Sequence, residues 1–437
     1  MLFSGAPAPS EKGIQVPHAV IEAVKGTRDI LPDEAGRWQF VEAQAREVFG
    51  LYGFREIRTP IFEPTELFAR GIGQETDIVS KEMYTFEDRG GESLTLRPEA
   101  TAGIVRAVIE HHLYQTDPAL KVYAIGPMCR AENVQKGRYR QFNQVDVEVF
   151  GVTSPSVDVE VIEMALAYIE RCGLARYELV LNSVGDAKCR PAYVEILRTA
   201  LRAEKDKLCG DCQRRTETNP LRVLDCKVPQ DQAVIESLPK ISDHLCDDCR
   251  AHFSEVKREL ELLGIPYRLS HRLVRGLDYY VRTTFEVLSG ELGRTQNSVL
   301  GGGRYDGLVQ QLGGPDLPGI GFALGMERLI MLIPPVAVEA RCEVFLAPLV
   351  PEARDFALRL QRELRKAAVS VMMDHEGRGL KSQMKRADKL GARFVAILGQ
   401  DEMAKARWTI RNMKASTQEE IGLDAAAAYL IKETTVG

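Results

Sequence analysis

The stretch KVYAIGPMCRAENVQKGRYRQFNQVDVEVFG, residues 121–151, contains two β-like runs on either side of the polar loop AENVQKGRY. A loop this short predicts an antiparallel pair, because parallel neighbours need a long crossover connection. If residues 139–150 form a strand, successive side chains point to opposite faces. Val145, Val147 and Val149 then share a buried face. The opposite face carries four other side chains: Phe142, Gln144, Asp146 and Glu148.

This second face has two interpretations. It is either a solvated outer face of a sheet or the lining of a pocket. Arg130, Arg138 and Arg140 lie in or beside the loop. Guanidinium groups next to polar side chains suit bidentate binding of a carboxylate or a phosphate. The arginines therefore favour a pocket.

Two further stretches place polar groups beside apolar runs. In LTLRPEATAG, residues 94–103, Glu99 and Thr101 follow a β-like run and share one face if the alternation continues. Alternatively, they cap a helix that starts there. In GIGFALGMERLIMLI, residues 319–333, a strand passes into an apolar helix that carries Arg328 near its start. An unpaired arginine there would be costly, so we expect it to face an anion or stack on a flat ring.

The stretch LVRGLDYYVRTTFEV, residues 273–287, sets Arg275, Asp278, Tyr279 and Tyr280 beside a β-like run at 279–288. A cation and two phenols so close to a hydrophobic run indicate a binding site. The nearby GGGRYDGL, residues 301–308, has the spacing of neither a G-x-G-x-x-G motif nor a P-loop.

Length and composition favour a soluble globular protein of two or three domains, with 437 residues, 45% hydrophobic and 27% charged. No apolar run approaches the roughly 20 residues of a membrane helix. Residues 188–262 read as helical, charged and cysteine-bearing. Beyond a linker at 334–340, strands and helices alternate. We expect an α+β domain on an antiparallel sheet with a helical insertion, then a compact α/β domain with a mostly parallel sheet.

Together these stretches resemble the class II aminoacyl-tRNA synthetases and, within them, the histidyl-tRNA synthetase family. GFREIRTPIFEPTELF at 53–68 is similar to the first class motif, residues 121–151 to the second and 319–333 to the third. LVRGLDYYVRTTFEV and GGGRYDGL resemble the signatures of the histidine enzymes. The resemblance implies a tail at 1–24, a catalytic domain at 25–333 with its insertion near 188–262, and an anticodon-binding domain at 341–437. It also implies an ATP-dependent histidine–tRNA ligase that forms a homodimer around Pro60.

The resemblance further implies which residues bind L-histidine. Arg275 reaches the carboxylate of histidine and the α-phosphate of ATP, and with Arg130 it forms the catalytic pair. Glu148 and Tyr280 suit the two imidazole nitrogens, of which one donates and one accepts a hydrogen bond when the ring is neutral. We assign Asp278 only a structural role. The full set expected to bind histidine is Glu99, Thr101, Arg130, Gln144, Glu148, Arg275, Tyr279 and Tyr280.

For ATP, the resemblance places Arg130 on the α-phosphate and Arg138 toward the β- and γ-phosphates. Glu132 would lie near the adenine or a metal ion, and Mg²⁺ is expected with the phosphates. The base would lie between an aromatic ring and a guanidinium group. The expected ATP set is Arg130, Glu132, Arg138, Phe142 and Arg328.

Two regions are candidates for contact with tRNA. Gln135 and Lys136 in the loop of the second motif would face the acceptor end. Residues 380–414 hold nine lysines and arginines against three acids, although the net charge of the whole chain is −5. Within them Lys381, Lys385 and Lys389 share one face of an expected helix, which suits a phosphate partner or a solvated surface.

The cysteines suggest a second kind of site. CGDC at 209–212 and CDDC at 246–249 are separated by 33 residues, with Cys226 between them. Cys209, Cys212, Cys246 and Cys249 would match a structural zinc site, and the alternative is an insertion with reduced thiols. Nine cysteines without a secretion signal predict a reducing cytoplasm and no disulfide framework.

Two other functions have to be weighed. One is the regulatory subunit that some bacteria attach to ATP phosphoribosyltransferase, which resembles this family but usually loses the C-terminal domain and the site arginines and tyrosines. In this sequence the C-terminal domain and the site arginines and tyrosines are all present. The other is a different class II enzyme, such as the prolyl or threonyl one, which would lack LVRGLDYY.

Overall fold

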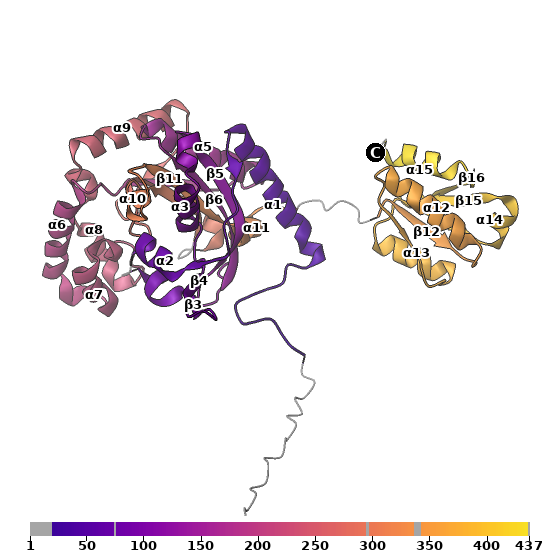
Figure 1. Ribbon diagram of the computed structural model, residues 1–437, viewed down its shortest axis with the longest axis horizontal. Coiled ribbons are helices and arrows are strands. Elements are labelled where there is room, and N and C mark those ends of the chain that lie inside the picture. The colour runs from indigo at the N-terminus through magenta and orange to yellow at the C-terminus, as the bar shows by residue number, and fades with distance from the viewer. Residues whose placement is uncertain (1–19, 74–75, 294–296, 336–341, 436–437) are drawn as a thin grey trace, which may run out of the picture. The chain divides into compact units, whose positions relative to one another are not determined.

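The computed structural model describes residues 20–73, 76–293, 297–335 and 342–435. The chain divides into two compact units, unit 1 (residues 1–336) and unit 2 (residues 337–437), each with its own sheet and core (Figure 1). Most of the expected tail at 1–24 and of the linker at 334–340 lies outside the described residues. Within the described parts, no helix is long and apolar enough to cross a membrane.

Unit 1 is built on an eight-stranded sheet in the order β1-β5-β6-β11-β10-β9-β7-β8. Its six central strands pair antiparallel, as the short 121–151 loop predicted. The edge strands β1 and β8 pair parallel to their neighbours, so the sheet is mixed. Long connections at 57–120 and 184–267 supply the crossovers that parallel pairing needs. The strands are β1 Arg55–Glu56, β5 Lys121–Cys129, β6 Gln141–Phe150, β7 Glu178–Ser183, β8 Arg268–Leu269, β9 Val281–Leu288, β10 Ser298–Arg304 and β11 Gly319–Gly325.

The valine face of β6 lies in the main core of unit 1. Val145, Val147 and Val149 are at most 1% exposed and belong to the same cluster as side chains of α1 and α5. Full burial of one such side chain contributes about 1.5–3 kcal/mol. Alternation along β6 therefore directs its other side chains to the opposite face of the sheet, as expected. The helices that contribute to this core are α1 Pro32–Leu51, α5 Pro155–Arg171, α9 Asp247–Leu262 and α11 Met326–Leu332.

The opposite face is partly covered by α3 and α10, which share a core cluster with side chains of β5. A three-stranded sheet in the order β2-β4-β3 forms within the connection between β1 and β5. The strand expected at 279–288 begins only at Val281, so Tyr279 and Tyr280 lie in the turn before β9. The remaining elements here are β2 Phe62–Pro64, α2 Thr65–Ile72, η1 Ile78–Glu82, β3 Tyr84–Glu87, β4 Ser93–Leu96, α3 Thr101–Glu110, α4 Leu113–Thr116, η6 Gly290–Leu292 and α10 Leu308–Gln311.

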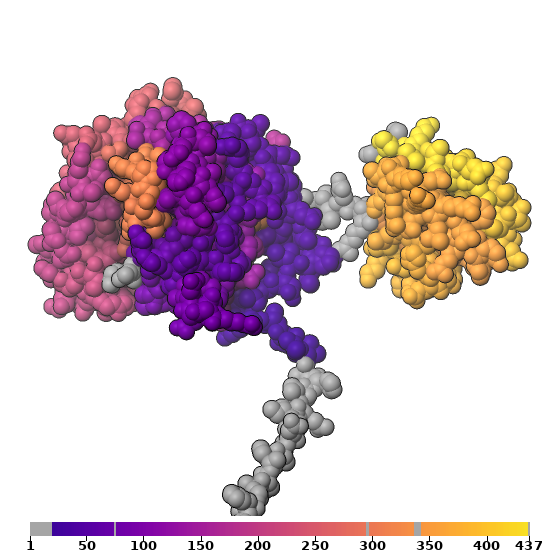
Figure 2. All heavy atoms as spheres, in the orientation of Figure 1, coloured from indigo at the N-terminus to yellow at the C-terminus, as the bar shows by residue number. Residues whose placement is uncertain are grey.

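The insertion between β7 and β8 is helical, as predicted. Residues 184–267 are all described and contain no strand. The insertion has its own core, to which six cysteines contribute, and it forms one side of unit 1 in the space-filling view (Figure 2). Its helices are α6 Arg190–Ala203, η2 Lys205–Lys207, α7 Gly210–Thr218, η3 Pro220–Val223, η4 Pro229–Asp231, α8 Gln232–Ser237, η5 Ile241–His244 and α9 Asp247–Leu262.

Unit 2 has a five-stranded sheet in the order β13-β12-β14-β15-β16. The first three strands are parallel, as expected for an α/β domain, but β15 and β16 form an antiparallel hairpin that was not predicted. Four of the six residues of β16 are exposed, so the segment lacks the apolar pattern that indicates a strand. The elements are β12 Val344–Pro348, α12 Ala353–Lys366, β13 Val371–Met373, α13 Leu380–Lys389, β14 Phe394–Leu398, α14 Gln400–Lys405, β15 Arg407–Asn412, β16 Thr417–Gly422 and α15 Ala426–Thr435.

Candidate active site

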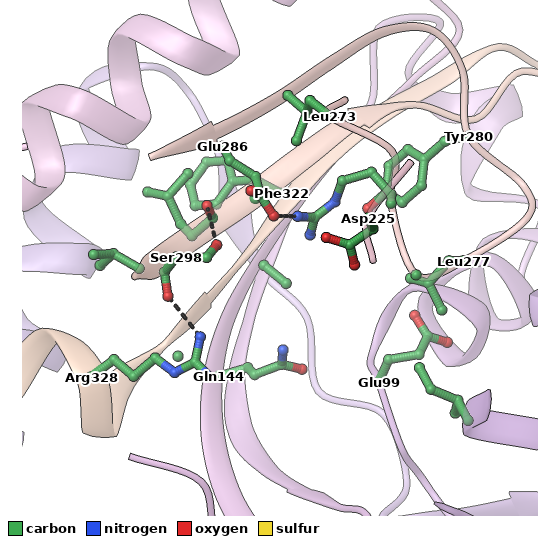
Figure 3. Close-up of a pocket in the computed structure, with 18 of the residues that line it drawn as sticks. Glu99, Gln144, Asp225, Leu273, Leu277, Tyr280, Glu286, Ser298, Phe322 and Arg328 are labelled. Carbon is green, nitrogen blue, oxygen red and sulfur yellow. Dashed lines mark hydrogen bonds and ion pairs between the residues drawn. The ribbon is translucent and has the colours of Figure 1, made fainter. Parts of the chain in front are cut away.

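A cavity of ≈ 540 Å³ opens on the polar face of the large sheet, lined by segments from residue 77 to residue 328 (Figure 3). Every residue expected to bind histidine or ATP lines it. These residues come from α3, β6, the 121–151 loop, the turn before β9 and α11. The second face of β6 is therefore the lining of a pocket and not a solvated surface. The twelve are Glu99, Thr101, Arg130, Glu132, Arg138, Phe142, Gln144, Glu148, Arg275, Tyr279, Tyr280 and Arg328.

Glu99 and Thr101 reach the cavity from a helix terminus, so the strand alternation proposed for them was wrong. Thr101 is the first residue of α3, and the Glu99 carboxylate accepts hydrogen bonds from the backbone N–H groups of Thr101 (2.8 Å) and Ala102 (2.9 Å). Burial raises the pKa of Glu99, and these hydrogen bonds oppose the shift. The helix-capping interpretation and the pocket interpretation are therefore compatible, because the same carboxylate caps α3 and lines the cavity.

Glu148 is held between two hydroxyl groups at the floor of the cavity. The Thr101 hydroxyl donates to its Oε1 at 2.6 Å, and the Tyr305 phenol donates to its Oε2. Burial raises the pKa of Glu148 to about 8. A Cβ at Gly321 would overlap Oε2, so only glycine leaves room for this carboxylate. Glu148 is thus fixed in place and can change protonation state near neutral pH.

Arg275 also lines the cavity and forms an ion pair with Glu286. Its guanidinium also lies 5.8 Å from the centre of the Tyr280 ring. A Cβ at Gly301 would lie 2.5 Å from Cζ and Nη2 of Arg275. The glycine run GGGRYDGL, which had no assigned role, therefore makes space for this arginine.

Two residues of β6 carry buried acceptor oxygens that have no hydrogen-bond partner among the described residues. Gln144 Oε1 and both carboxylate oxygens of Asp146 are buried without a hydrogen bond. Burial, and next the neighbouring Glu148, raise the pKa of Asp146 well above its usual range. Unsatisfied buried acceptors are costly and call for a ligand or water. Sequence analysis placed Asp146 on this face but assigned it no role.

Seven arginines among the described residues line the cavity, and the three assigned to ATP lie close to one another. Arg130 donates to the Pro98 carbonyl (2.8 Å) and places its guanidinium 5.2 Å from the centre of the Phe142 ring. Arg138 pairs with Glu132 at 2.6 Å. Arg328 donates to the Ser298 carbonyl at 2.7 Å (Figure 3).

Burial lowers the pKa of Arg328, and the neighbouring charge of Arg138 lowers it further. Such crowding of cations suits a polyanionic ligand. The stacking of a base between Phe142 and Arg328 stays a prediction.

Tyr305 and Glu286 are lining residues that sequence analysis missed. Both stand in stretches that were quoted, but their place depends on strand pairing. Glu286 of β9 is the direct partner of Gly301 in β10, which brings its carboxylate to Arg275. No local pattern identifies that neighbour.

The residues proposed to contact tRNA are exposed and lie outside the cavity lining. Gln135 and Lys136 occupy an exposed turn in which Gln135 and Arg138 exchange backbone hydrogen bonds. In unit 2, Lys381, Lys385 and Lys389 are exposed on α13, the helix expected at 380–391. Their contacts with tRNA stay predictions.

The two C-x-x-C pairs do not form one four-cysteine site. Each pair lies instead with a third cysteine and an aspartate, and the ligand atoms of each group lie within 4.8 Å of one another. The pairs are separated because they stand at the starts of two different helices: Cys209 is the N-cap residue of α7 and Cys246 is the N-cap residue of α9. We call the groups cluster A (Asp186, Cys189, Cys246, Cys249) and cluster B (Cys209, Cys212, Cys226, Asp231).

Comparison with known proteins relates both units to one kind of enzyme. The family model "Histidyl-tRNA synthetase" matches residues 26–329, and "Anticodon binding domain" matches residues 343–433. A curated histidine–tRNA ligase from Geobacter metallireducens is 52% identical over 93% of this chain and 98% of its own length. One from Solibacter usitatus is 53% identical over 94% of this chain and 99% of its length.

Among solved structures, the apo histidyl-tRNA synthetase of S. aureus is similar with a TM-score of 0.80 and 39% identity, over 94% of this chain and all of that one. A protein from Bacillus halodurans described as an ATP phosphoribosyltransferase regulatory subunit/histidyl-tRNA synthetase has a TM-score of 0.63 at 22% identity. It covers 84% of this chain and 97% of its own, and at that identity it is evidence for the fold alone.

Proposed function

This chain belongs to the histidyl-tRNA synthetase family, and we propose that its large cavity activates L-histidine with ATP and transfers the histidyl group to the 3′ end of tRNA(His). It is thus an aminoacyl-tRNA ligase. The observation that carries the residue-level proposal is convergence. Glu148, Tyr280 and Arg275, from separate parts of the chain, line one cavity together with the arginines assigned to ATP, Arg130, Arg138 and Arg328.

In this proposal the imidazole of histidine binds between Glu148 and Tyr280. The carboxylate of Glu148 accepts the ring N–H, and the phenol donates to the other nitrogen. The substrate ammonium then lies against the unsatisfied oxygens of Gln144 and Asp146 and against Glu99. A site built on such hydrogen bonds rejects amino acids that lack the matching nitrogens by large factors.

The first reaction step joins histidine to AMP. A carboxylate oxygen of histidine attacks the α-phosphorus in line, the bond from that phosphorus to the bridging oxygen breaks, and pyrophosphate leaves with the electron pair. Arg275 holds the histidine carboxylate against the α-phosphate, Arg130 binds the α-phosphate, and Arg138 binds the leaving phosphates. Positioning and fixed positive charge therefore supply most of the catalysis.

The family and its substrate also imply Mg²⁺, which prefers carboxylate and phosphate oxygens. Glu82 and Glu132 both line the cavity, and burial and then the charge of Glu132 raise the pKa of Glu82. Two carboxylates that disfavour each other's charge fit a divalent cation, so these two residues would hold it. When bound, the ion neutralises charge on the phosphates.

In the second step a ribose hydroxyl at the end of tRNA attacks the activated carbonyl and displaces AMP. Gln135 and Lys136, exposed beside the cavity arginines, would contact the acceptor end. Lys381, Lys385 and Lys389 would bind phosphates of the anticodon region, each as a point charge.

A homodimer and a cytoplasmic location complete the proposal. Ile61 and Phe62 next to Pro60 are 41% and 50% exposed, which supports an interface at the first motif. All nine cysteines are free, which suits a reducing compartment. Light scattering on a size-exclusion column gives a mass of twice 48.7 kDa if the dimer forms.

Exchange of labelled pyrophosphate into ATP tests the reaction, with each amino acid in turn. We expect exchange with histidine only. Arg275→Ala should abolish it without unfolding the chain, whereas Arg258→Ala, which removes an exposed arginine on α9, should not change it. Exchange with proline, or exchange within a few-fold of wild type in Arg275→Ala, would contradict the assignment.

A further inference from the structure

Clusters A and B have the composition and spacing of metal sites, although neither takes part in the reaction above. Each combines a C-x-x-C pair at a helix N-terminus with a third cysteine and one aspartate from distant turns. We propose that the insertion binds two zinc ions, each held by three thiolates and one carboxylate, and that these ions position the segment that carries Arg275 and Tyr280.

Cluster A closes the insertion on itself. The Sγ atoms of Cys189 and Cys249 lie 3.9 Å apart, and Asp186 Oδ1 lies 3.6 Å from the Cys189 sulfur and 3.9 Å from that of Cys246. Sulfur atoms bonded at about 2.3 Å to one tetrahedral zinc ion are separated by about 3.8 Å. An ion here joins the turn after β7, where the insertion begins, to α9, where it ends.

Cluster B contains a buried carboxylate without a cationic partner. Asp231 is 0% exposed, and its oxygens contact the Cys209 N–H at 2.8 Å and the Cys226 sulfur at 3.1 Å. It forms no ion pair with a lysine or arginine among the described residues. A buried charge of this kind is expensive unless a cation compensates it. The Sγ atoms of Cys209 and Cys226 lie 4.0 Å apart, as in cluster A.

Backbone groups around the sulfurs complete both sites. The N–H of Val228 points at the Cys226 sulfur at 3.5 Å, and the N–H of Asp186 points at the Cys189 sulfur at 3.4 Å. Donors of this kind stabilise thiolates and orient metal ligands.

The geometry selects among the ions that sulfur ligands bind. Three sulfurs and one oxygen in a tetrahedral group suit zinc, which has no redox chemistry. In a [2Fe–2S] or [4Fe–4S] cluster at least two of the ligating atoms sit on different iron atoms, and these lie farther apart than the ligands of one ion. All four ligand atoms of each group lie within 4.8 Å of one another, which indicates one ion in each.

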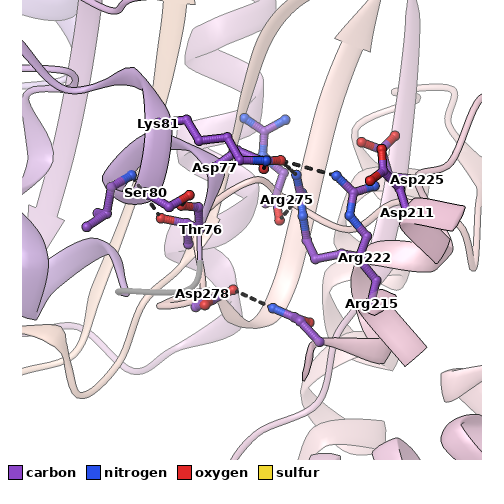
Figure 4. Close-up of polar contacts among 12 residues, drawn as sticks. Thr76, Asp77, Ser80, Lys81, Asp211, Arg215, Arg222, Asp225, Arg275 and Asp278 are labelled. Atoms are coloured by element: carbon purple, nitrogen blue, oxygen red, sulfur yellow. Dashed lines mark hydrogen bonds and ion pairs between the residues drawn. The ribbon is translucent and has the colours of Figure 1, made fainter. Parts of the chain in front are cut away.

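One arginine beside each cluster connects it to the active-site segment. Next to cluster A, Arg190 donates to the backbone carbonyls of Val184 (3.0 Å) and Tyr280. Arg222 lies in the sequence between Cys212 and Cys226 of cluster B. Its guanidinium donates to the backbone carbonyl of Arg275 at 3.1 Å (Figure 4). Each zinc ion would thus hold the turn or short helix from which one of these arginines reaches Arg275 or Tyr280.

Metal content is the first test. The chain, purified without chelator and desalted after incubation with Zn²⁺, should contain about two zinc ions per chain by mass spectrometry. X-ray absorption at the zinc edge should show three sulfurs at about 2.3 Å and one oxygen at about 2.0 Å per ion. Less than about a tenth of an equivalent, or one ion with four sulfurs, overturns the proposal.

Variants outside the C-x-x-C pairs give a second test, because a single four-cysteine site would not depend on them. Cys189→Ser and Cys226→Ser should each retain one ion and the double variant none. Cys342→Ser removes a buried thiol of unit 2 and should retain two. Retention of the wild-type zinc content in both single variants would overturn the proposal. If a variant does not fold, the sulfur count of the wild-type chain decides.

A third measurement tests the positioning role. In Cys226→Ser the KM for histidine in pyrophosphate exchange should rise about tenfold, because Arg222 no longer holds the carbonyl of Arg275 firmly. The KM for ATP should rise less than the KM for histidine, because Arg130, Arg138 and Arg328 bind the nucleotide as well. An unchanged KM for histidine in a variant that has lost one ion would overturn the role in positioning.

Discussion

Gly301→Ala should disable the active site by moving one side chain. The new Cβ would lie 2.5 Å from Cζ and Nη2 of Arg275, whereas ordinary contact begins at 3.4 Å. The three atoms nearest to this Cβ all belong to the guanidinium of Arg275 and none to the backbone. The side chain can therefore yield while the sheet stays intact.

The distances set the size of the effect. Restoring ordinary contact requires the guanidinium to move by about 1 Å, and a misplacement of that size costs about 100-fold in rate. This corresponds to ~2.7 kcal/mol of transition-state stabilisation. The ion pair of Arg275 with Glu286 is weakened at the same time, so a small loss of stability is expected as well.

Histidine-dependent pyrophosphate exchange measures the effect, with kcat/KM as the readout. Gly290→Ala is the matched control, because a Cβ there meets nothing within 4 Å and the residue lies outside the cavity lining. Thermal unfolding of Gly301→Ala in the wild-type and Arg275→Ala backgrounds identifies the cause. If the added methyl group clashes with Arg275, Gly301→Ala lowers the stability of the wild-type chain more than it lowers the stability of the Arg275→Ala chain.

Two results would refute this reasoning. A kcat/KM within threefold of wild type would mean that Arg275 need not occupy its present position. An equal loss of stability in both backgrounds would mean that the added methyl group disturbs the backbone and not Arg275.

Three further outcomes are expected. The pKa of Glu148 is about 8, so below that pH its carboxyl is protonated and accepts the imidazole N–H more weakly than the carboxylate does. We therefore expect kcat/KM for histidine to rise by up to about tenfold between pH 6.5 and 7.5, and Glu148→Gln should lose the part of this rise that is not due to histidine itself. Asp158→Asn should cost about 1.5–3 kcal/mol in urea unfolding, because it removes the carboxylate that lies 2.8 Å from the buried guanidinium of Arg304 and leaves Asp306, at 2.9 Å, as the remaining acidic partner. Asp211→Asn, at an exposed ion pair, is the control, and a loss below about 1 kcal/mol in Asp158→Asn would contradict the argument. Asp146→Asn should raise the KM for histidine about tenfold in the exchange assay and leave the KM for ATP within about twofold, and the reverse pattern would place Asp146 on the nucleotide side.

Local patterns predicted the parts of the site that a single strand or helix carries. The period of two along β6 separated the valines of the core from Gln144, Asp146 and Glu148, and the structure confirms both faces. The same rule failed for Glu99 and Thr101, because the chain turns into α3 at that point. The hairpin of β15 and β16 was missed because β16 lacks the apolar pattern of a strand, although β15 buries Trp408 and Ile410.

Neighbours across strands or between turns depended on the tertiary structure. Gly301 lies beside Glu286 because β10 pairs with β9, and Cys226 joins Cys209 and Cys212 because the insertion folds back on itself. Two C-x-x-C pairs in one segment indicated one metal site in the sequence and form two clusters in space.

The amino-acid sequence by itself therefore determined the residue types of the site, the face of β6 on which they stand, and the family. The tertiary structure decided which of them touch: Arg275 with Glu286, Glu148 with Tyr305, and each cysteine pair with its own aspartate. The physical reason is one of range. Side-chain direction follows from backbone geometry within a few residues, whereas contact between residues 10 to 160 positions apart depends on how the whole core packs.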